Sequence, residues 1–356
     1  MKIGKSAAAA AAVQNAYVPV DADFRLKDNA GEIAIDTNFS AQSFWKDVFI
    51  RYFRKISAVI GLVLIILISA MAVVGPGMNT YTYSEQNLSQ KNFAPRVKSL
   101  EKLGIFNGNE SMKTTTGSKI VNQYEAKGLD DVYYWFGSDN FGRDIWTRTW
   151  SGARVSLIIA VAAAVIDMVI GMSYGLISGY FGGKVDMIMQ RILEIANGIP
   201  RLVIVTLLLL VLQPGMVTII FALMLTEWVG MSRIARAEML KLKEQEFVLA
   251  SRTLGASSFF IIFREILPNI IGPIITQVMF SIPTAIFTEA FLSFVGLGIP
   301  VPQCSLGSLI SEGFNSFTTH PYQIIPPIVV MALLMLSFNL VADGLREALD
   351  PKMKEM

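Results

Sequence analysis

Long apolar segments alternate with shorter polar ones along most of this 356-residue chain. A helix needs about 20 mostly apolar residues to cross the roughly 30 Å hydrocarbon core of a bilayer. Six segments reach or approach that length: residues 56–76, 154–178, 187–212, 216–232, 267–296 and 323–345. The pattern predicts an all-α membrane protein with six transmembrane helices.

Composition agrees with that prediction and narrows the chemistry. Hydrophobic residues make up 53% of the chain and charged residues 16%, which is too apolar for a soluble globular protein. The net charge of +2 gives no sign of a nucleic-acid partner. Cys304 and His320 are the only cysteine and histidine, which excludes an internal disulfide and leaves too little for a Cys/His metal site or a His-based triad. We predict no catalytic, cofactor-binding or metal-binding residues in this chain.

Lys and Arg gather on one side of the predicted spans. The 233–266 loop is basic, whereas the loops 213–215 and 297–322 contain neither Lys nor Arg. Because basic loops stay in the cytoplasm, both termini are predicted to be cytoplasmic and residues 77–150 extracellular. Cys304 should then face outward, and we expect a membrane-impermeant thiol reagent to label it in intact cells unless a partner covers it.

The chain before the first span divides into two parts. Residues 1–42 combine an alanine run with a polar stretch, which predicts a flexible or weakly helical tail. In residues 43–55, Phe44, Val48 and Tyr52 recur every four residues beside basic side chains. This pattern is typical of a helix that lies in the membrane interface; a plain extension of the first span is the alternative.

The basic loop contains the pattern of a helix, a glycine turn and a second helix. A helix over Lys243–Leu254 would place four residues at spacing 0, 3, 4, 7 on one face. These residues are Phe247, Ala250, Ser251 and Leu254. Gly255 suits a left-handed C-cap, and Pro268 suits the start of the fifth span. We predict a docking element here; an amphipathic hairpin resting on lipid headgroups is the alternative.

The same loop resembles the cytoplasmic signature of ABC importer permeases. That signature reads Glu-Ala-Ala, three residues, Gly, nine residues, Ile, one residue, Leu-Pro. The corresponding residues here are Leu249-Ala250-Ser251, Gly255, Glu265 and Leu267-Pro268. Gly255 and Leu267-Pro268 keep their spacing, whereas Leu249 and Glu265 replace the signature Glu and Ile.

Three longer segments resemble one branch of these permeases, the peptide and nickel branch, and within it the C-type subunit of oligopeptide permeases. They are "FGSDNFGRDIWTRTWSGARVSL" (136–157), "EAFLSFVGLGIP" (289–300) and "FNLVADGLREALDP" (338–351). The resemblance covers about residues 42–352. It departs at Ser305-Leu306-Gly307, where the commoner version is Ser-Trp-Gly.

The resemblance implies the type I ABC importer permease fold with an interfacial elbow helix and an extracellular insertion. The implied parts are a cytoplasmic tail (1–42), the elbow helix (43–55), the first transmembrane helix (56–76), the extracellular insertion (77–150), the permease core (151–346) with a cytoplasmic coupling loop (233–266), and a cytoplasmic C-terminus (347–356). Such a chain is a permease subunit in a bacterial plasma membrane.

The resemblance also implies partners. A second homologous permease would complete the oligopeptide path, an extracellular binding protein would deliver the peptide, and two cytoplasmic ATPases would drive import. The basic loop would couple the spans to one ATPase. The residues assigned to this coupling are Phe247, Ala250, Ser251, Arg252, Leu254, Gly255, Leu267 and Pro268. Dipeptide, oligopeptide and nickel cargo all stay open.

ATP chemistry is expected in the partners alone. The chain contains no G-x-x-x-x-G-K-[ST] segment, and "FGGKVD" (181–186) lacks both the correctly spaced first glycine and the Ser or Thr after its lysine. A phosphate-cradling loop needs those residues. ATP and Mg²⁺ are therefore predicted to be bound by the ATPases and not by this chain.

Polar stripes in two spans are candidates for the translocation path. In the third span, Asp186, Gln190, Glu194, Asn197 and Arg201 fall on one side, and we single out Glu194 and Asn197. In the fifth span the stripe consists of Asn269, Thr276, Gln277, Thr284 and Thr288. Neutral hydrogen-bonding groups suit peptide backbones of varied sequence. Packing against neighbouring helices or the partner permease is the alternative for both stripes.

Asp167 and Glu289 are acids at membrane depth, and such groups suggest function. A proton relay through them would make the protein a proton-coupled secondary peptide transporter, which is the rival hypothesis. Neither acid has an obvious basic partner in an adjoining span, so a structural or gating role is favoured. A membrane anchor for a signalling assembly is a third class, and it would not need the polar stripes.

Overall fold

The computed structural model describes residues 44–114 and 117–349. The predicted tail, residues 1–42, and the chain after residue 349 lie outside the described residues.

The chain divides into two compact units, residues 1–47 and 48–356. Helix α2 (Phe44–Arg54) begins at the end of the first unit, and the other described elements belong to the second. Its bounds agree with the predicted interfacial helix. Val48 and Tyr52 on this helix are buried, and the Tyr52 hydroxyl donates to the carbonyl oxygen of Ala58 at 3.1 Å.

Five spans in the described residues are long and apolar enough to cross a membrane. The first two are Ile56–Gly77 (α3, Ile56–Val74; η2, Gly75–Gly77) and Ile145–Phe181 (α5, Ile145–Ile166; the π-helical η5, Asp167–Gly171; α6, Met172–Phe181). The next two are Met216–Leu242 (α9, Met216–Thr226; α10, Trp228–Leu242) and Ser258–Phe294 (α12, Ser258–Phe260; the π-helical η6, Ile261–Ile266; α13, Leu267–Phe294). The last is Pro321–Leu349 (η7, Pro321–Gln323; α15, Ile325–Leu349).

All five spans are longer than the apolar segments that predicted them, and the second and fourth predicted spans differ most. The second was expected over 154–178 but begins at Ile145, because Asp144 caps the helix by accepting a hydrogen bond from the Thr147 backbone N–H at 2.8 Å. The fourth was expected to end at residue 232 but continues to Leu242, since no Gly or Pro stops the helix there. Hydropathy marks the lipid-facing length of a helix, and caps mark its ends.

The third predicted span, 187–212, is not one continuous helix. It consists of α7 (Gly183–Gly198) and α8 (Arg201–Val211), which are bent by 79° relative to each other. Pro200 explains the break, because proline removes a backbone donor and holds the preceding residue, Ile199, in an extended conformation. Counted as one broken span, this pair brings the described spans to the predicted six.

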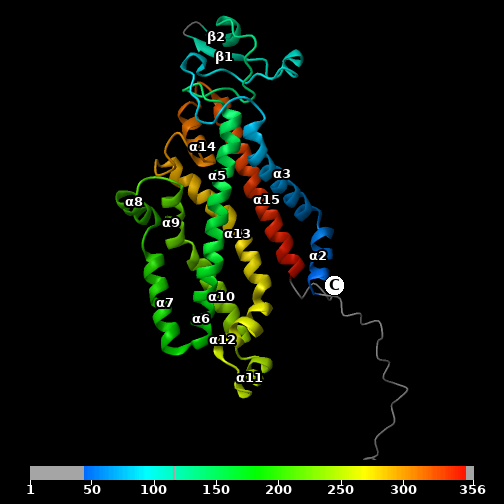
Figure 1. Cartoon of the computed structure of the whole chain (residues 1–356), viewed down its shortest axis with the longest axis vertical. Coiled ribbons are helices and arrows are strands. Elements are labelled where there is room, and N and C mark those ends of the chain that lie inside the picture. The colour runs from blue at the N-terminus through cyan, green and yellow to red at the C-terminus, as the bar shows by residue number, and fades with distance from the viewer. Residues whose placement is uncertain (1–43, 115–116, 350–356) are drawn as a thin grey trace, which may run out of the picture. The chain divides into compact units, whose positions relative to one another are not determined.

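Glycines let several of these helices approach closely. A Cβ atom at Gly175 of α6 would lie 2.2 Å from the Ser232 carbonyl oxygen of α10. A Cβ atom at Gly61 of α3 would lie 2.8 Å from the Ser337 carbonyl oxygen of α15. Helices in lipid pack through such small residues. Helices α5, α13 and α15 form the centre of the bundle in Figure 1, and their buried side chains share one apolar core.

The segment between α3 and α5 folds around its own aromatic core. Its elements are η3 (Leu88–Gln90), η4 (Glu101–Leu103), β1 (Asn109–Thr114), β2 (Gly117–Asn122) and α4 (Gln123–Ala126), with β1 and β2 paired antiparallel. Phe93, Tyr124 and Tyr134 are buried together. Burial raises the pKa of the Tyr124 hydroxyl, which donates to the Ala94 carbonyl oxygen at 2.7 Å. This segment and the α10–α13 loop lie at opposite ends of the bundle (Figure 1).

Helix α14 (Leu306–Asn315) packs between α5 and α13 at the end of the bundle that carries this segment. Ser305 caps it in a reciprocal capping box with Ser308. Cys304, directly before the cap, is only 2% exposed, and its Sγ lies 3.4 Å from the Arg148 carbonyl oxygen. The expected labelling of Cys304 therefore needs correction, because the chain's own α5 covers the thiol.

We predict that the Cys304 thiol resists alkylation in the native protein. Burial raises the pKa of this thiol, so the reactive thiolate is scarce at neutral pH and reagent access is blocked. Maleimide labelling of purified protein should be slow before denaturation and complete afterwards. A Val301→Cys variant in a Cys304→Ser background should react rapidly, because Val301 is exposed; equal native rates for the two thiols would contradict the described burial.

Candidate functional sites

Helix α11 (Glu246–Thr253) forms the centre of the basic loop. Gln245 precedes it in an extended conformation, and the carboxylate of Glu246 and the guanidinium of Arg252 suit the two ends of the helix dipole. Gly255 has φ +85°, the predicted left-handed conformation, and the Ala256 backbone N–H donates to the Ser251 carbonyl oxygen at 3.0 Å. The predicted helix, glycine turn and second helix are confirmed.

The inner face of α11 is held by one apolar and one polar contact. Val248 is fully buried in a cluster that includes Ile261 and Ile262. The Ser251 hydroxyl donates to Glu265 Oε1 at 2.5 Å. Ser251 therefore turns toward η6 rather than toward the open face predicted for it. Glu265, which departs from the signature, is the residue that binds Ser251.

The outer face of α11 and its turn expose large apolar side chains. Phe247 and Ala250 are exposed, and Leu254 is 87% exposed at the tip of the loop. Arg252 stacks its guanidinium 5.0 Å from the centre of the Tyr180 ring on α6. We call Phe247, Ala250 and Leu254 the α11 face. An apolar surface at the end of a charged loop is typical of a contact with another protein.

Leu267 and Pro268, the last residues of the predicted coupling set, begin helix α13. Leu267 is half-buried against the same cluster as Val248, and Pro268 occupies the first turn, where the absence of a backbone N–H costs no hydrogen bond. These two residues join the loop to the span and do not belong to the α11 face.

The polar stripe of α13 does not form one open surface. Thr276 and Thr288 are buried, Gln277 is half-buried, and Asn269 and Thr284 are exposed. The three threonine hydroxyls donate to carbonyl oxygens four residues earlier in their own helix. The structure thus divides the predicted stripe between packing and exposed positions.

The stripe of the third span divides in a similar way. Asp186 binds both Nε and Nη2 of Arg236 on α10 at 2.6 Å, and Gln190 donates to the Ser178 hydroxyl at 3.1 Å. These residues hold α7 against its neighbours. Glu194 and Asn197 are exposed, and Glu194 pairs with Arg191 in its own helix at 2.6 Å.

Arg201, at the break between α7 and α8, contacts a residue that the sequence analysis missed. Its Nη1 lies 2.7 Å from Glu227 Oε1 and donates to the Thr288 hydroxyl at 3.0 Å. Thr288 is therefore brought together with the third span, whereas Glu194 and Asn197 are not. The signal for Glu227 was its charge within an apolar segment.

Glu289 is fully buried and ties three helices together. Its carboxylate accepts from the hydroxyls of Ser156 on α5 at 3.1 Å and Ser293 on α13 at 2.7 Å. The Ser156 hydroxyl in turn accepts from the Leu306 backbone N–H of α14 at 3.1 Å. Gly307 allows this approach, because a Cβ there would lie 2.4 Å from the Ala290 Cα.

Asp167 is buried at the start of η5, and its Oδ1 has no hydrogen-bond partner within the described ranges. Neither Asp167 nor Glu289 forms an ion pair with any described residue. The geometry of Glu289 is that of a helix-packing group.

Two arginines and two carboxylates form a second buried group, which the sequence analysis also missed. Arg143 Nε lies 2.6 Å from Asp139 Oδ2, and Glu312 Oε2 on α14 lies 2.7 Å from Arg143 Nη2 and 2.9 Å from Arg148 Nη1. Arg148 also pairs with Asp139. The signal was present in the charges of "FGRDIWTR" (141–148), where the apolar helix α5 begins.

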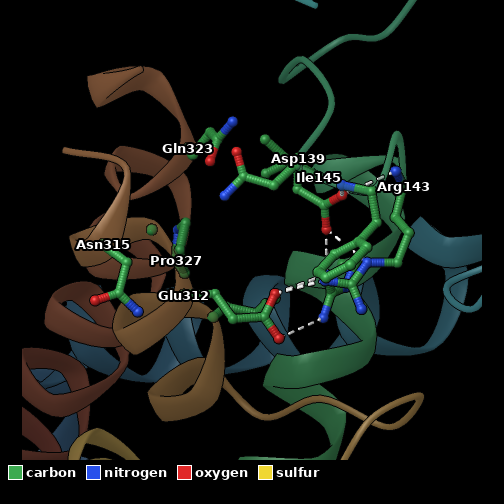
Figure 2. Close-up of a pocket in the computed structure, with 12 residues that line it drawn as sticks. Asp139, Arg143, Ile145, Glu312, Asn315, Gln323 and Pro327 are labelled. Atoms are coloured by element: carbon green, nitrogen blue, oxygen red, sulfur yellow. Dashed lines mark hydrogen bonds and ion pairs between the residues drawn. The ribbon is translucent and has the colours of Figure 1, made fainter. Parts of the chain in front are cut away.

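This group borders a cavity of about 170 Å³ between α5, α14 and the start of the last span. Figure 2 shows Asp139 and Arg143 on one side of the cavity and Glu312 and Asn315 on the other, and an ion pair joins Arg143 to Glu312. The two positive and two negative charges balance, so the ionised groups already satisfy one another. We interpret the group as an anchor that holds α14 to α5.

The fold defines a polytopic membrane protein with one apolar loop face and one extramembrane segment. A family profile described as binding-protein-dependent transport system inner membrane component matches residues 171–355, and one described as the N-terminal TM domain of oligopeptide transport permease C matches residues 43–95. The chain belongs to the family of binding-protein-dependent transport system inner membrane components.

Its relatives are similar over nearly their whole length. The oligopeptide transport system permease protein OppC of Bacillus subtilis is 41% identical over 92% of this chain and 95% of its own. The dipeptide transport system permease protein DppC of the same species is 38% identical over 96% of each chain. A solved structure of the MetNI methionine ABC transporter, inward facing, aligns with a TM-score of 0.49 at 17% identity, covering 57% of this chain and 96% of the other.

Membership in this family makes the chain a non-catalytic permease subunit of an ABC importer in the bacterial plasma membrane. The family implies ATPase, substrate-binding and second-permease partners. The rival hypothesis of a proton-coupled secondary transporter receives no support from these relatives.

We predict that Arg148→Met lowers the stability of the purified protein by about 3 kcal/mol, because removing one partner of a buried ion pair leaves the remaining charges poorly compensated. Thermal unfolding followed by tryptophan fluorescence measures this change. The matched control is Lys241→Met, which removes an exposed ion pair with Glu238 and should cost less than about 1 kcal/mol. Equal melting temperatures for the two variants would contradict the anchor.

Proposed function

We propose that this chain is a transmembrane permease subunit of an ATP-driven oligopeptide importer. The observation that carries the proposal is the agreement between family membership and the exposed α11 face at one end of the spans. Relatives named as oligopeptide and dipeptide permeases at 41% and 38% identity support peptide as the cargo. The chain would form half of the path and a second homologous permease the other half.

The proposal includes an orientation. The basic α11 loop and both termini would be cytoplasmic, and the segment between α3 and α5 would be extracellular, in agreement with the distribution of Lys and Arg. The extracellular segment would then be available to a peptide-binding protein, and two ATPases would contact the cytoplasmic side. ATP and Mg²⁺ would be bound by those ATPases.

The α11 face would transmit ATPase motion to the spans. Leu254 and Phe247 offer apolar anchors, and Ala250 between them allows close approach. Val248 and the contact between Ser251 and Glu265 join the loop to η6 and α13. A displacement of α11 would therefore reach α13 through packed side chains rather than through a flexible linker.

The exposed members of the polar stripes would line the peptide path. They are Asn269 and Thr284 on α13 and Glu194 and Asn197 on α7. Thr276 and Gln277 would support α13, Thr288 would position Arg201, and Glu289 would keep α13 and α14 together. Asp167 would have a structural or gating role.

We expect peptide uptake by the reconstituted complex to require ATP and not a proton gradient, because the chain itself lacks a nucleotide-binding loop. Purified alone, it should show no ATP turnover. Proteoliposomes loaded with ATP, with and without an imposed pH gradient, test this. Uptake in Asp167→Asn should be equally insensitive to the gradient; gradient-driven uptake by the isolated chain would reject the proposal.

Enlarging Ala250 to Trp should reduce ATPase binding and transport at least tenfold while leaving membrane insertion intact, because a packed contact tolerates added volume poorly. Gly255→Val should act similarly, since a β-branched residue resists the φ of +85° found there. Co-purification of ATPase and peptide uptake measure both effects.

Arg252→Ala provides the matched control, because Arg252 stacks on Tyr180 of this chain and lies outside the α11 face. It should be milder than either variant. Gly255→Asn should also be milder than Gly255→Val, since Asn adopts positive φ more readily. Normal assembly and transport in both Ala250→Trp and Gly255→Val would mean that α11 only rests on lipid headgroups.

A further inference from the structure

Arg201 carries a charge at the break in the third predicted span, partway along the bundle. It begins α8, after the 16-residue helix α7 has risen about 24 Å from Gly183. Its partner Glu227 lies near the middle of the Met216–Leu242 span. The rise of α7 and the contact with Glu227 place the guanidinium partway along the spans, at the depth of the hydrocarbon core.

The guanidinium is accessible, whereas its partner is not. The Arg201 side chain is 42% exposed and that of Glu227 is 11% exposed. An arginine at this depth does not face lipid, because a charge in hydrocarbon is energetically unfavourable. The exposed side of Arg201 therefore faces a water-filled path or a second protein.

Two of the three guanidinium nitrogens have no contact with the described residues. Both contacts, to Glu227 and to the Thr288 hydroxyl, are made by Nη1, and no described residue accepts a hydrogen bond from Nε or Nη2. The geometry at Glu227 is that of a charge contact without a hydrogen bond, since Oε1 has no hydrogen-bond partner among the described residues. The Nε and Nη2 edge is the part of arginine that binds a carboxylate with two parallel hydrogen bonds.

We propose that the Nε and Nη2 edge of Arg201 binds the C-terminal carboxylate of the peptide as it passes the break between α7 and α8. This inference rests on the proposed function. Peptides of varied sequence share only their backbone and their termini, so a permease that accepts many of them must neutralise the terminal charge by a group of its own. An unpaired carboxylate would otherwise meet a large desolvation cost in the path.

The surrounding contacts suit transient binding. Thr288 fixes the guanidinium from one side, so the free edge stays presented to the path. Glu227 balances the charge of Arg201 when no peptide is present, and it competes for the guanidinium as the peptide leaves. Passage through the permease requires a site that binds the carboxylate strongly enough to admit it and weakly enough to release it.

The test compares two peptides that differ only at the C-terminus, a free acid and its amide, in ATP-driven uptake by proteoliposomes containing the whole complex. The quantity measured is the ratio of kcat/KM for acid over amide, in the wild type and in Arg201→Gln. The preference of the binding protein is the same in both complexes and cancels in this comparison. Losing a charge-assisted contact should lower the ratio about tenfold, chiefly by loss of acid uptake.

Two further variants make the outcome specific. Arg201→Lys keeps the charge and loses the planar fork, so its ratio should lie between those of the wild type and Arg201→Gln. Arg233→Gln removes another exposed arginine, on helix α10, and should leave the ratio unchanged.

An equal fall in acid and amide uptake in Arg201→Gln would mean that Arg201 binds an acid of the partner permease or only holds Glu227, and would overturn the assignment. An unchanged ratio, or the same loss in Arg233→Gln, would overturn it too. If the wild-type complex imports neither peptide, the proposed function itself fails, and this result is distinct from the others.

Discussion

Charges inside an apolar helical bundle must be compensated by the protein itself, and this constraint positions the helices of the chain. Asp139, Arg143, Arg148 and Glu312 balance one another where α5 meets α14. Glu289 is satisfied by serine hydroxyls and holds α13 to the same two helices. One end of the bundle is therefore locked by polar contacts that would be costly to break one at a time.

The other half of the bundle contains one charge contact that is less complete. Arg201 uses one of its three nitrogens, and its side chain stays accessible where the third span breaks. Farther along, α11 presents an apolar face that no described part of the chain covers, while Val248 and Ser251 connect it to η6 and α13. The bundle thus has a rigid end where α5 meets α14, an accessible charge at Arg201 and a docking surface, the α11 face, that is connected to the spans. These three features suit a subunit that moves a peptide when a partner protein moves it.

Much of this architecture was predictable because apolar length and glycine spacing are local properties. The helix of α11, the φ of Gly255 and five spans followed from them. The break at Pro200 was missed, since apolar residues on both sides hid the backbone effect of one proline. Cys304 was expected to be accessible, and Ser251 to face outward, because periodicity cannot reveal that α5 or Glu265 lies opposite. Pairs such as Arg201 and Glu227 depend on tertiary contacts that one sequence does not show.

The central claim is that α11 contacts an ATPase and passes its motion to the spans. Leu254→Cys in a Cys304→Ser background, coupled to a benzophenone maleimide and illuminated in the assembled complex, tests that contact directly. The account predicts an adduct with the ATPase whose yield changes on adding ATP, and none from a cysteine at Val301 at the opposite end. A transport-competent complex in which the Leu254→Cys adduct forms only with lipid, or with no ATPase at all, would contradict it.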